Sequence, residues 1–154
     1  MKQHARDMDR IMALHSLVKD RPRVANARII AAIYIKNELV SIGFNQHKTS
    51  PMAVRYAKNP NAECIHAEVD AIHRAALTFT GPLSKRNELL KKQKTTLYVV
   101  RSKAVDYNHR ASIWGNAMPC NGCMKAIKDF NINRVVYTMD EDVIGKVFGE
   151  FTNG

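Results

Sequence analysis

The chain has 154 residues, 45% of them hydrophobic, and a formal net charge of +10 at pH 7. This length is typical of one domain whose core needs no disulfide bonds, so we expect residues 1–154 to form a single domain. No apolar run reaches about 18 residues and charges interrupt the first stretch of chain, so we expect neither a membrane span nor a signal peptide. The odd number of cysteines, three, fits a reducing compartment, and a cytoplasmic location is expected.

The positive charge is unevenly distributed, because residues 1–60 and 81–110 carry most of the excess lysine and arginine. A basic surface of this kind has two interpretations. It can simply aid solubility, or it can attract a phosphorylated small molecule or a nucleic acid. Charge alone does not distinguish a nucleotide from a polymer.

The expected elements alternate between helix and strand. Apolar residues at helical spacing predict a helix over 6–18, and two apolar, β-branched runs predict an antiparallel pair of strands over 29–35 and 39–44. Further periodic segments predict these elements, in chain order: helix 67–77, a short helix within 83–95, strand 96–100, loop 102–118, helix 120–130, strand 134–138 and a last helix over 143–148. Such alternation favours an α/β fold with helices on both faces of one sheet.

Two short motifs carry the chemistry: His66-Ala67-Glu68 and Pro119-Cys120-Asn121-Gly122-Cys123. Cys120 and Cys123 are three residues apart at a helix start, so their thiols lie on the same side. His66 lies at the start of another expected helix. One His and two Cys can bind Zn²⁺ and leave its fourth position to water, which is the open arrangement of a catalytic zinc site.

Glu68 lies two residues from His66 and projects to another side of the helix, so it can contact the water without displacing the ligand. We therefore expect it to act as the catalytic residue that moves protons from water to the base and the departing amine. A structural zinc site closed by Cys64 or His73 is the main alternative. A buried small cysteine and an ordinary histidine are the simpler interpretations of those two residues.

The two motifs resemble those of the cytidine and deoxycytidylate deaminase superfamily, and the resemblance covers roughly residues 28–138. It implies a zinc-dependent deaminase domain with a three-layer α/β/α sandwich: a mixed five-stranded sheet with helices on both faces. The fifth strand would come from residues 146–152. A homo-oligomer is also implied.

The resemblance further implies substrate contacts. Asn45, after Gly43 and Phe44, would contact the sugar hydroxyl, and the backbone N–H groups of Ala67 and Cys120 would lie near the base carbonyl. Asn45 could equally be a turn residue that ends a strand.

The chain departs from many relatives at residues 102–118, which lie between the third strand and the second motif, and Met118 stands where a Glu is common. Trp114 in this segment could stack on a base or could anchor the loop as a buried residue. A substrate phosphate could be bound by Arg55, Arg110 or other basic residues near the motifs, which are Lys48, Lys58, Arg101 and Lys103.

The leading hypothesis is hydrolytic deamination of dCMP to dUMP and ammonia, with a nucleotide as the small-molecule partner. A deaminase acting on adenine or cytosine within RNA or single-stranded DNA is the second hypothesis, supported by the charge of +10. A non-catalytic zinc module that binds nucleic acid is the third. Glu68 argues against this last hypothesis, because a structural zinc site needs no proton shuttle.

Overall fold

The computed structural model describes residues 2–24, 27–47, 51–56, 65–104 and 112–153. The helices are α1 Lys2–Val18, α2 Pro51–Arg55, α3 Ala67–Ala76, α4 Leu83–Lys91 and α5 Asn121–Asp129. The strands are β1 Arg28–Ile35, β2 Glu38–Phe44, β3 Thr95–Ala104, β4 Ser112–Gly115, β5 Arg134–Thr138 and β6 Phe148–Thr152. The helices and strands expected between residues 6 and 138 are therefore confirmed as α1, β1, β2, α3, α4, β3, α5 and β5, with shifts of a few residues at their ends.

The six strands form one mixed sheet with the order β2-β1-β3-β5-β6, and β4 pairs with the end of β3. The β3–β5 pair is parallel, as a helical crossover through α5 requires, and the other named pairs are antiparallel. The expected sheet had five strands. The sixth, β4, arises because β3 continues to Ala104 and part of the expected loop 102–118 folds back along it.

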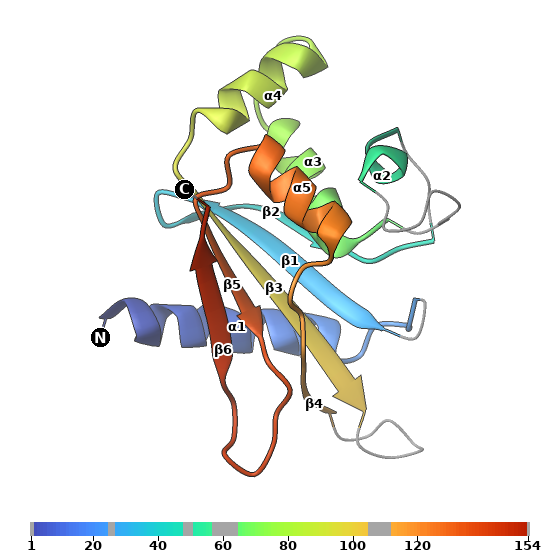
Figure 1. The fold of residues 1–154 in the computed structure, drawn as a ribbon, viewed down its shortest axis with the longest axis vertical. Helices are drawn as coiled ribbons and strands as arrows, with labels where there is room; N and C mark the ends of the chain where they lie inside the picture. Colours follow the sequence, from blue (N-terminus) through green and yellow to red (C-terminus); the bar gives the residue numbers. More distant parts are fainter. Residues whose placement is uncertain (1, 25–26, 48–50, 57–64, 105–111, 154) are drawn as a thin grey trace.

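Helices cover both faces of the sheet, which confirms the expected α/β/α sandwich (Figure 1). One core lies between the sheet and α1, which contributes Ile11, Leu14 and Val18. The other lies under α3 and α5, where Ile72 and Ile127 pack against the opposite side of β1 and β3. We call these the α1 face and the α3–α5 face.

Helix α3 lies directly on the backbone of β2 at Gly43. A Cβ atom added at Gly43 would come within 2.3 Å of the Ala71 nitrogen and 2.5 Å of the Ala67 oxygen. Ser41 on the same strand donates its hydroxyl proton to the Ala71 oxygen at 2.7 Å. The absence of a side chain at Gly43 therefore sets the close distance between α3 and the sheet.

The α1 face buries a charged network around Asp7, which is 1% exposed. Its carboxylate accepts hydrogen bonds from the Tyr98 hydroxyl at 2.5 Å, from Gln3 at 3.0 Å and from two nitrogens of the Arg134 guanidinium. Burial by itself raises the pKa of Asp7, but the hydrogen bonds, chiefly those from Arg134, lower it below its ordinary value. This buried charge is thus fully paired.

The C-terminal segment differs from one expectation and agrees with another. The helix expected over 143–148 is absent: Asp142 and Gly145 form an isolated bridge in the connection between β5 and β6. Gly145 has a φ of 107°, which is incompatible with a helix. The strand expected within 146–152 is confirmed as β6. Within the described ranges, no helix combines the length and apolar character needed to cross a membrane.

Candidate metal centre

Two helix N-termini meet at the end of the α3–α5 face and bring the predicted ligands together. His66 is the residue before α3, and Cys120 is the residue before α5, with Cys123 in the first turn of that helix. Both capping residues have extended backbone, and neither helix start has a side-chain cap. The N-terminal N–H groups and the dipoles of the two helices make this place favourable for thiolates.

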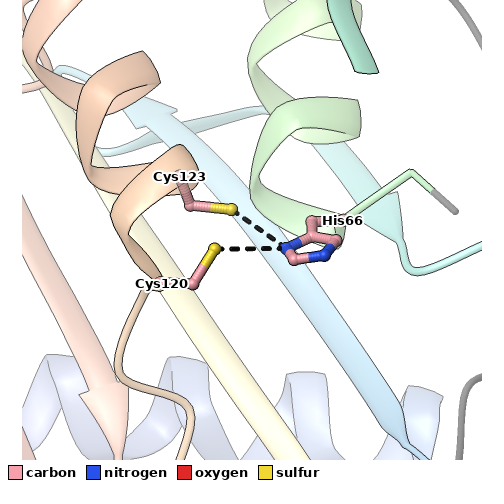
Figure 2. Close-up of side chains that lie close together, drawn as sticks. All are labelled: His66, Cys120 and Cys123. Carbon is pink, nitrogen blue, oxygen red and sulfur yellow. Dashed lines mark hydrogen bonds between the residues drawn. The ribbon is translucent and has the colours of Figure 1, made fainter. Parts of the chain in front are cut away.

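The three side chains point at one another, as Figure 2 shows. The Nδ1 atom of His66 lies 3.3 Å from the Cys123 sulfur and 3.5 Å from the Cys120 sulfur, and the three ligand atoms lie within 4.8 Å of one another. Tetrahedral Zn²⁺ with ordinary bond lengths would place N and S about 3.6 Å apart. The donor set and its spacing therefore fit zinc.

The protonation of the two thiols also suits a metal. Hydrogen bonds from Cys123 first and from His66 next lower the pKa of Cys120 to about 3, against the opposing effect of burial. The same shared proton, together with burial, raises the pKa of Cys123. One sulfur is a thiolate at neutral pH, and a cation between the two would displace the proton from the other.

Glu68 lies in the first turn of α3, beside the three ligands, and is 5% exposed. Burial is the main cause that raises the pKa of its carboxyl group. It lines the same cavity as His66 and Cys120. A carboxyl group so placed can exchange protons with a molecule bound in the cavity.

The site cavity, which has a volume of about 380 Å³, opens at this centre. Such a volume is typical of pockets for small molecules. One wall comes from the segment before β1 and from the first residues of β1 and α3, and the other from the segment between β4 and α5. Its described lining residues include Ile29, Asn45, Glu68, Val99, Arg101, Asn116 and Met118.

Arg101 lies at the edge of the site cavity, two residues beyond Val99 on β3. Its Nε atom is buried and has no hydrogen-bond partner among the described residues. Arg101 also lines a second cavity of about 170 Å³, with Arg23, Arg28 and Lys103. A buried unpaired guanidinium nitrogen is costly, and it therefore marks a place where a ligand can supply the missing acceptor.

Asn45 lines the site cavity, where its amide fastens the segment before β1. Its oxygen accepts a hydrogen bond from the Ile29 nitrogen at 3.0 Å, and its nitrogen donates to the Val24 and Ala27 oxygens at 3.0 and 3.1 Å. Ala67 is the first residue of α3 and is fully buried, so its N–H group belongs to the helix start that faces the centre.

Two residues expected to contact the substrate do not line the site cavity. Trp114 is fully buried on the α1 face, packed with Ile11, and does not line the site cavity, so its ring is part of the core. Arg55 forms an ion pair with Asp129 at 3.9 Å and lines a different cavity, beside Tyr56. Arg110, Lys48 and Lys58 lie outside the described residues.

Of the two residues considered as a fourth ligand that would close a structural zinc site, the structure describes only His73, and it lies away from the three ligands. His73 lines the same separate cavity as Arg55, and in the part of the chain that the structure describes, only His66, Cys120 and Cys123 form a metal-type group. Cys64 lies outside the described residues. The three-ligand arrangement is the one that the described side chains form.

Sequence reasoning missed several residues that shape the site. Arg23 and Arg28, which flank the second cavity, were counted only in the overall charge, and Asn116 was not singled out. The signal that could have found the two arginines is their position just before an expected buried strand, whose first residue, Ile29, lines the site cavity. Asn116 donates its backbone N–H to the Asp140 carboxylate and lines the site cavity. Its position there depends on the strand β4 just before it, which was not expected.

The comparisons with known proteins agree with this geometry. The family model described as the cytidine and deoxycytidylate deaminase zinc-binding region matches residues 5–139. Among solved structures, the chain is similar to the apo dCMP deaminase of cyanophage S-TIM5, with a TM-score of 0.51 and 15% identity over 87% of this chain and 83% of that one. A structure of that enzyme with dCMP and dUMP matches with a TM-score of 0.47 and 14% identity, over 88% and 80% of the two chains. At such identity the first similarity concerns the fold. No curated protein matches the sequence.

Proposed function

Because the chain belongs to the cytidine and deoxycytidylate deaminase family, with its zinc-binding region, we propose that it deaminates a cytosine nucleotide and that dCMP is its substrate. The products are dUMP and ammonia, and residues 1–154 act as one deaminase domain. One observation carries the choice of a nucleotide: the site cavity leads from the metal ligands to Arg101, which also borders a cavity lined by further basic residues.

His66, Cys120 and Cys123 are proposed to hold the zinc ion. When bound, zinc supplies a water whose pKa is near neutrality and which can attack C4 of the base. Glu68 takes a proton from that water and delivers it to N3 of the ring. It then takes the proton of the hydroxyl group that the water has left on C4 and gives it to the amino group there, so that the C4–N bond breaks, ammonia leaves and C4 becomes a carbonyl.

The rest of the nucleotide is proposed to extend along the cavity. The Ala67 N–H at the start of α3 donates to the base carbonyl, because the first amides of a helix lack intrahelical partners. Asn45, whose amide already fastens the wall of the cavity, contacts the sugar. Arg101 supplies its unpaired Nε–H to the phosphate, with the neighbouring positive charge of Arg28 behind it.

Kinetics on dCMP and deoxycytidine test this proposal, with ammonia release as the measurement. The zinc-loaded protein should convert dCMP far more efficiently than the nucleoside. Arg101→Gln should raise KM for dCMP by about 10- to 100-fold, the value of one or two charge-assisted hydrogen bonds, and should leave kcat/KM for deoxycytidine nearly unchanged.

Arg86→Gln, which removes a partly buried guanidinium on α4 outside both cavities, is the matched control and should behave like the wild type. Equal efficiency on dCMP and deoxycytidine would contradict a phosphate-binding role for Arg101. Loss of activity on both substrates in Arg101→Gln would instead assign it to the support of the cavity wall.

A base within single-stranded nucleic acid is the second candidate substrate, favoured by the basic residues that continue beyond Arg101. Conversion of a cytosine or adenine in an oligonucleotide, with no turnover of any free nucleotide, would decide for this candidate. A homo-oligomeric state and a cytoplasmic location stay predictions.

A further inference from the structure

Two apolar side chains are exposed at the end of the connection between β5 and β6. Val143 is fully exposed and Ile144 is 82% exposed. They are the central residues of a tight turn, in which Asp142 and Gly145 form a bridge and the Ile144 N–H donates to the Asp142 carboxylate at 2.8 Å. We call residues 142–145 the hairpin tip. Central turn residues are usually polar, so two adjacent apolar side chains held in water are typical of a surface that another molecule covers.

An apolar cavity of about 270 Å³ is lined by residues of α2, α3 and α4 and by Phe130 at the end of α5, and we call it the helix hollow. Its apolar lining includes Met52 of α2, Tyr56 just after that helix and Leu83 at the start of α4. The Tyr56 hydroxyl donates to the Asp129 carboxylate at 2.8 Å, which fixes the orientation of the ring. The hollow is therefore a preformed apolar surface.

The hairpin tip and the helix hollow lie at opposite ends of the molecule. In Figure 1, where the longest axis is vertical, the β5–β6 connection extends to the bottom and α2 and α4 lie in the upper part. The connection begins and ends at the paired residues Thr138 and Phe148, so the sheet holds it in this direction. The tip is thus out of reach of the hollow of its own chain, whereas the tip of a second copy can enter it.

The hairpin tip is acidic, in contrast to the chain as a whole, whose net charge is +10. Asp140, Glu141 and Asp142 directly precede the two apolar side chains. Asp140 and Glu141 form ion pairs with Lys103 and Lys146, and Asp142 has no ion pair among the described residues. A partner surface for this tip should therefore combine apolar side chains with positive charge.

The helix hollow has that combination. Lys85 and Arg86 follow Leu83 on α4, and neither has an acidic partner among the described residues. Arg55 lines the hollow and is 68% exposed, although it is paired with Asp129 at 3.9 Å. The two ends of the molecule are therefore complementary in charge and alike in their apolar character.

We propose that the hairpin tip of one copy docks into the helix hollow of a second copy. Val143 and Ile144 are then buried against Met52, Leu83 and Phe130, with the acidic residues of the tip beside α4. Because the contact joins two different surfaces, it is heterologous, and each copy offers a further tip or hollow until a ring closes. A small apolar ligand would suit the hollow but would leave the tip exposed. The proposal does not depend on the proposed function.

Sedimentation velocity of the zinc-loaded full-length protein, over a range of concentrations, tests the proposal. The wild type should associate as its concentration rises, and added salt should weaken the association. Val143→Ser combined with Ile144→Ser should raise the dissociation constant by about tenfold or more, because two apolar side chains no longer leave water. Leu83→Glu should do the same by placing a carboxylate against the acidic tip. All three residues are exposed, so both variants should keep the wild-type melting temperature.

The two variants together give the sharpest result. Each keeps one working half of the contact, so an equimolar mixture should form pairs that contain one copy of each. Leu39→Ser, which removes a 50% exposed side chain of β2, is the matched control and should associate as the wild type does.

A wild type that stays monomeric, or association that is unchanged in both variants, would overturn the proposal. So would an equimolar mixture that does not associate. Loss of association in Leu83→Glu alone would also overturn it, because the hollow would then receive a different part of the second copy.

Discussion

Two buried carboxylates on opposite faces of the sheet are used in opposite ways. Asp7 on the α1 face accepts hydrogen bonds from three side chains, and its pKa is lowered. Glu68 on the α3–α5 face lines a cavity beside three metal-type ligands, and burial raises its pKa. The first carboxylate is satisfied by the protein itself. The second lines a cavity, and the effect of burial on its pKa outweighs that of its hydrogen bonds and of the nearby His66, which lower it.

The difference between the two carboxylates indicates which buried polar groups of this fold can react with or bind a ligand. A buried charge with a complete set of partners contributes to stability and has little left to offer a ligand. A buried polar group of a residue that lines a cavity, such as the Glu68 carboxyl or the unpaired Nε atom of Arg101, has been placed at a cost that a bound molecule can offset. Four substitutions test whether the two faces really divide function from stability.

The largest effect is expected from Glu68→Gln. Loss of the proton-transfer group should lower kcat by about 10³-fold or more, at the upper part of the range for general acid–base catalysis. Zinc content and melting temperature should stay close to those of the wild type, because the amide fills the same volume. Ammonia release and metal analysis on the same sample measure the two. Full activity in this variant would remove Glu68 from the proposed mechanism.

Asp7→Asn should show the reverse pattern. It leaves the Arg134 guanidinium, which is 19% exposed, with Glu150 as its remaining acidic partner among the described residues, and the free energy of unfolding should fall by about 3 kcal/mol. Urea denaturation gives this value, and kcat per bound zinc should be unchanged. A variant as stable as the wild type, or one that is stable but inactive, would break the proposed division between the faces.

Gly43→Ala probes a place where α3 lies directly against the backbone of β2. The added methyl group would meet the α3 backbone at 2.3 Å, so the helix must move, and unfolding should become easier by about 2 kcal/mol. Because α3 carries His66 and Glu68, kcat should fall as well. Ala31→Gly, on the neighbouring strand, gives a comparison in which a methyl group is removed from the same core; it should destabilise the protein with a smaller loss of kcat.

The smallest effect is expected from His15→Gln, which should change how the free energy of unfolding depends on pH. Burial, then the nearby charges of Lys146 and Lys19, lower the pKa of this histidine in the folded protein. A lowered folded pKa means that its contribution is complete above the unfolded value of about 6.5 and is lost as the pH falls below it. Between pH 7.5 and 5.5 the wild type should therefore lose up to about 1 kcal/mol more stability than His15→Gln, measured by urea denaturation. Equal losses would show that His15 is protonated as readily in the folded chain as in the unfolded one.

The metal ligands could be predicted from the sequence because each motif carries its own geometry. A Cys-x-x-Cys pair at a helix start places both sulfurs on one side, whatever the rest of the chain does, and His66 is predicted at the start of a second helix, α3. The order of strands and helices could be predicted for the same reason, because each apolar run shows its own periodicity within a short segment. The sandwich follows because the apolar side of every one of these elements must be buried.

Trp114 shows what local patterns cannot supply. Residues 102–118 were interpreted as a loop, and in the structure β4 pairs Trp114 with Ser102 and Gly115 with Arg101. Successive residues of a strand point to opposite faces, so this register places the tryptophan in the core under α1 and leaves Arg101 at the cavity. A shift of one residue would have exchanged these roles, and no short-range signal fixes the register.

The hydrogen bonds of Asn45 impose a rule on whatever lies against it. Both N–H groups of its amide are already engaged by the Val24 and Ala27 carbonyls, and its oxygen has one remaining lone pair after it accepts from Ile29. This side chain can therefore accept a hydrogen bond from a ligand but has none to donate. A free hydroxyl meets that condition, whereas an esterified oxygen, as at an internal link of a nucleic-acid chain, would face the lone pair with another lone pair. With the proposed contact between Asn45 and the sugar, a nucleotide with a free hydroxyl would be preferred to a nucleotide within a strand.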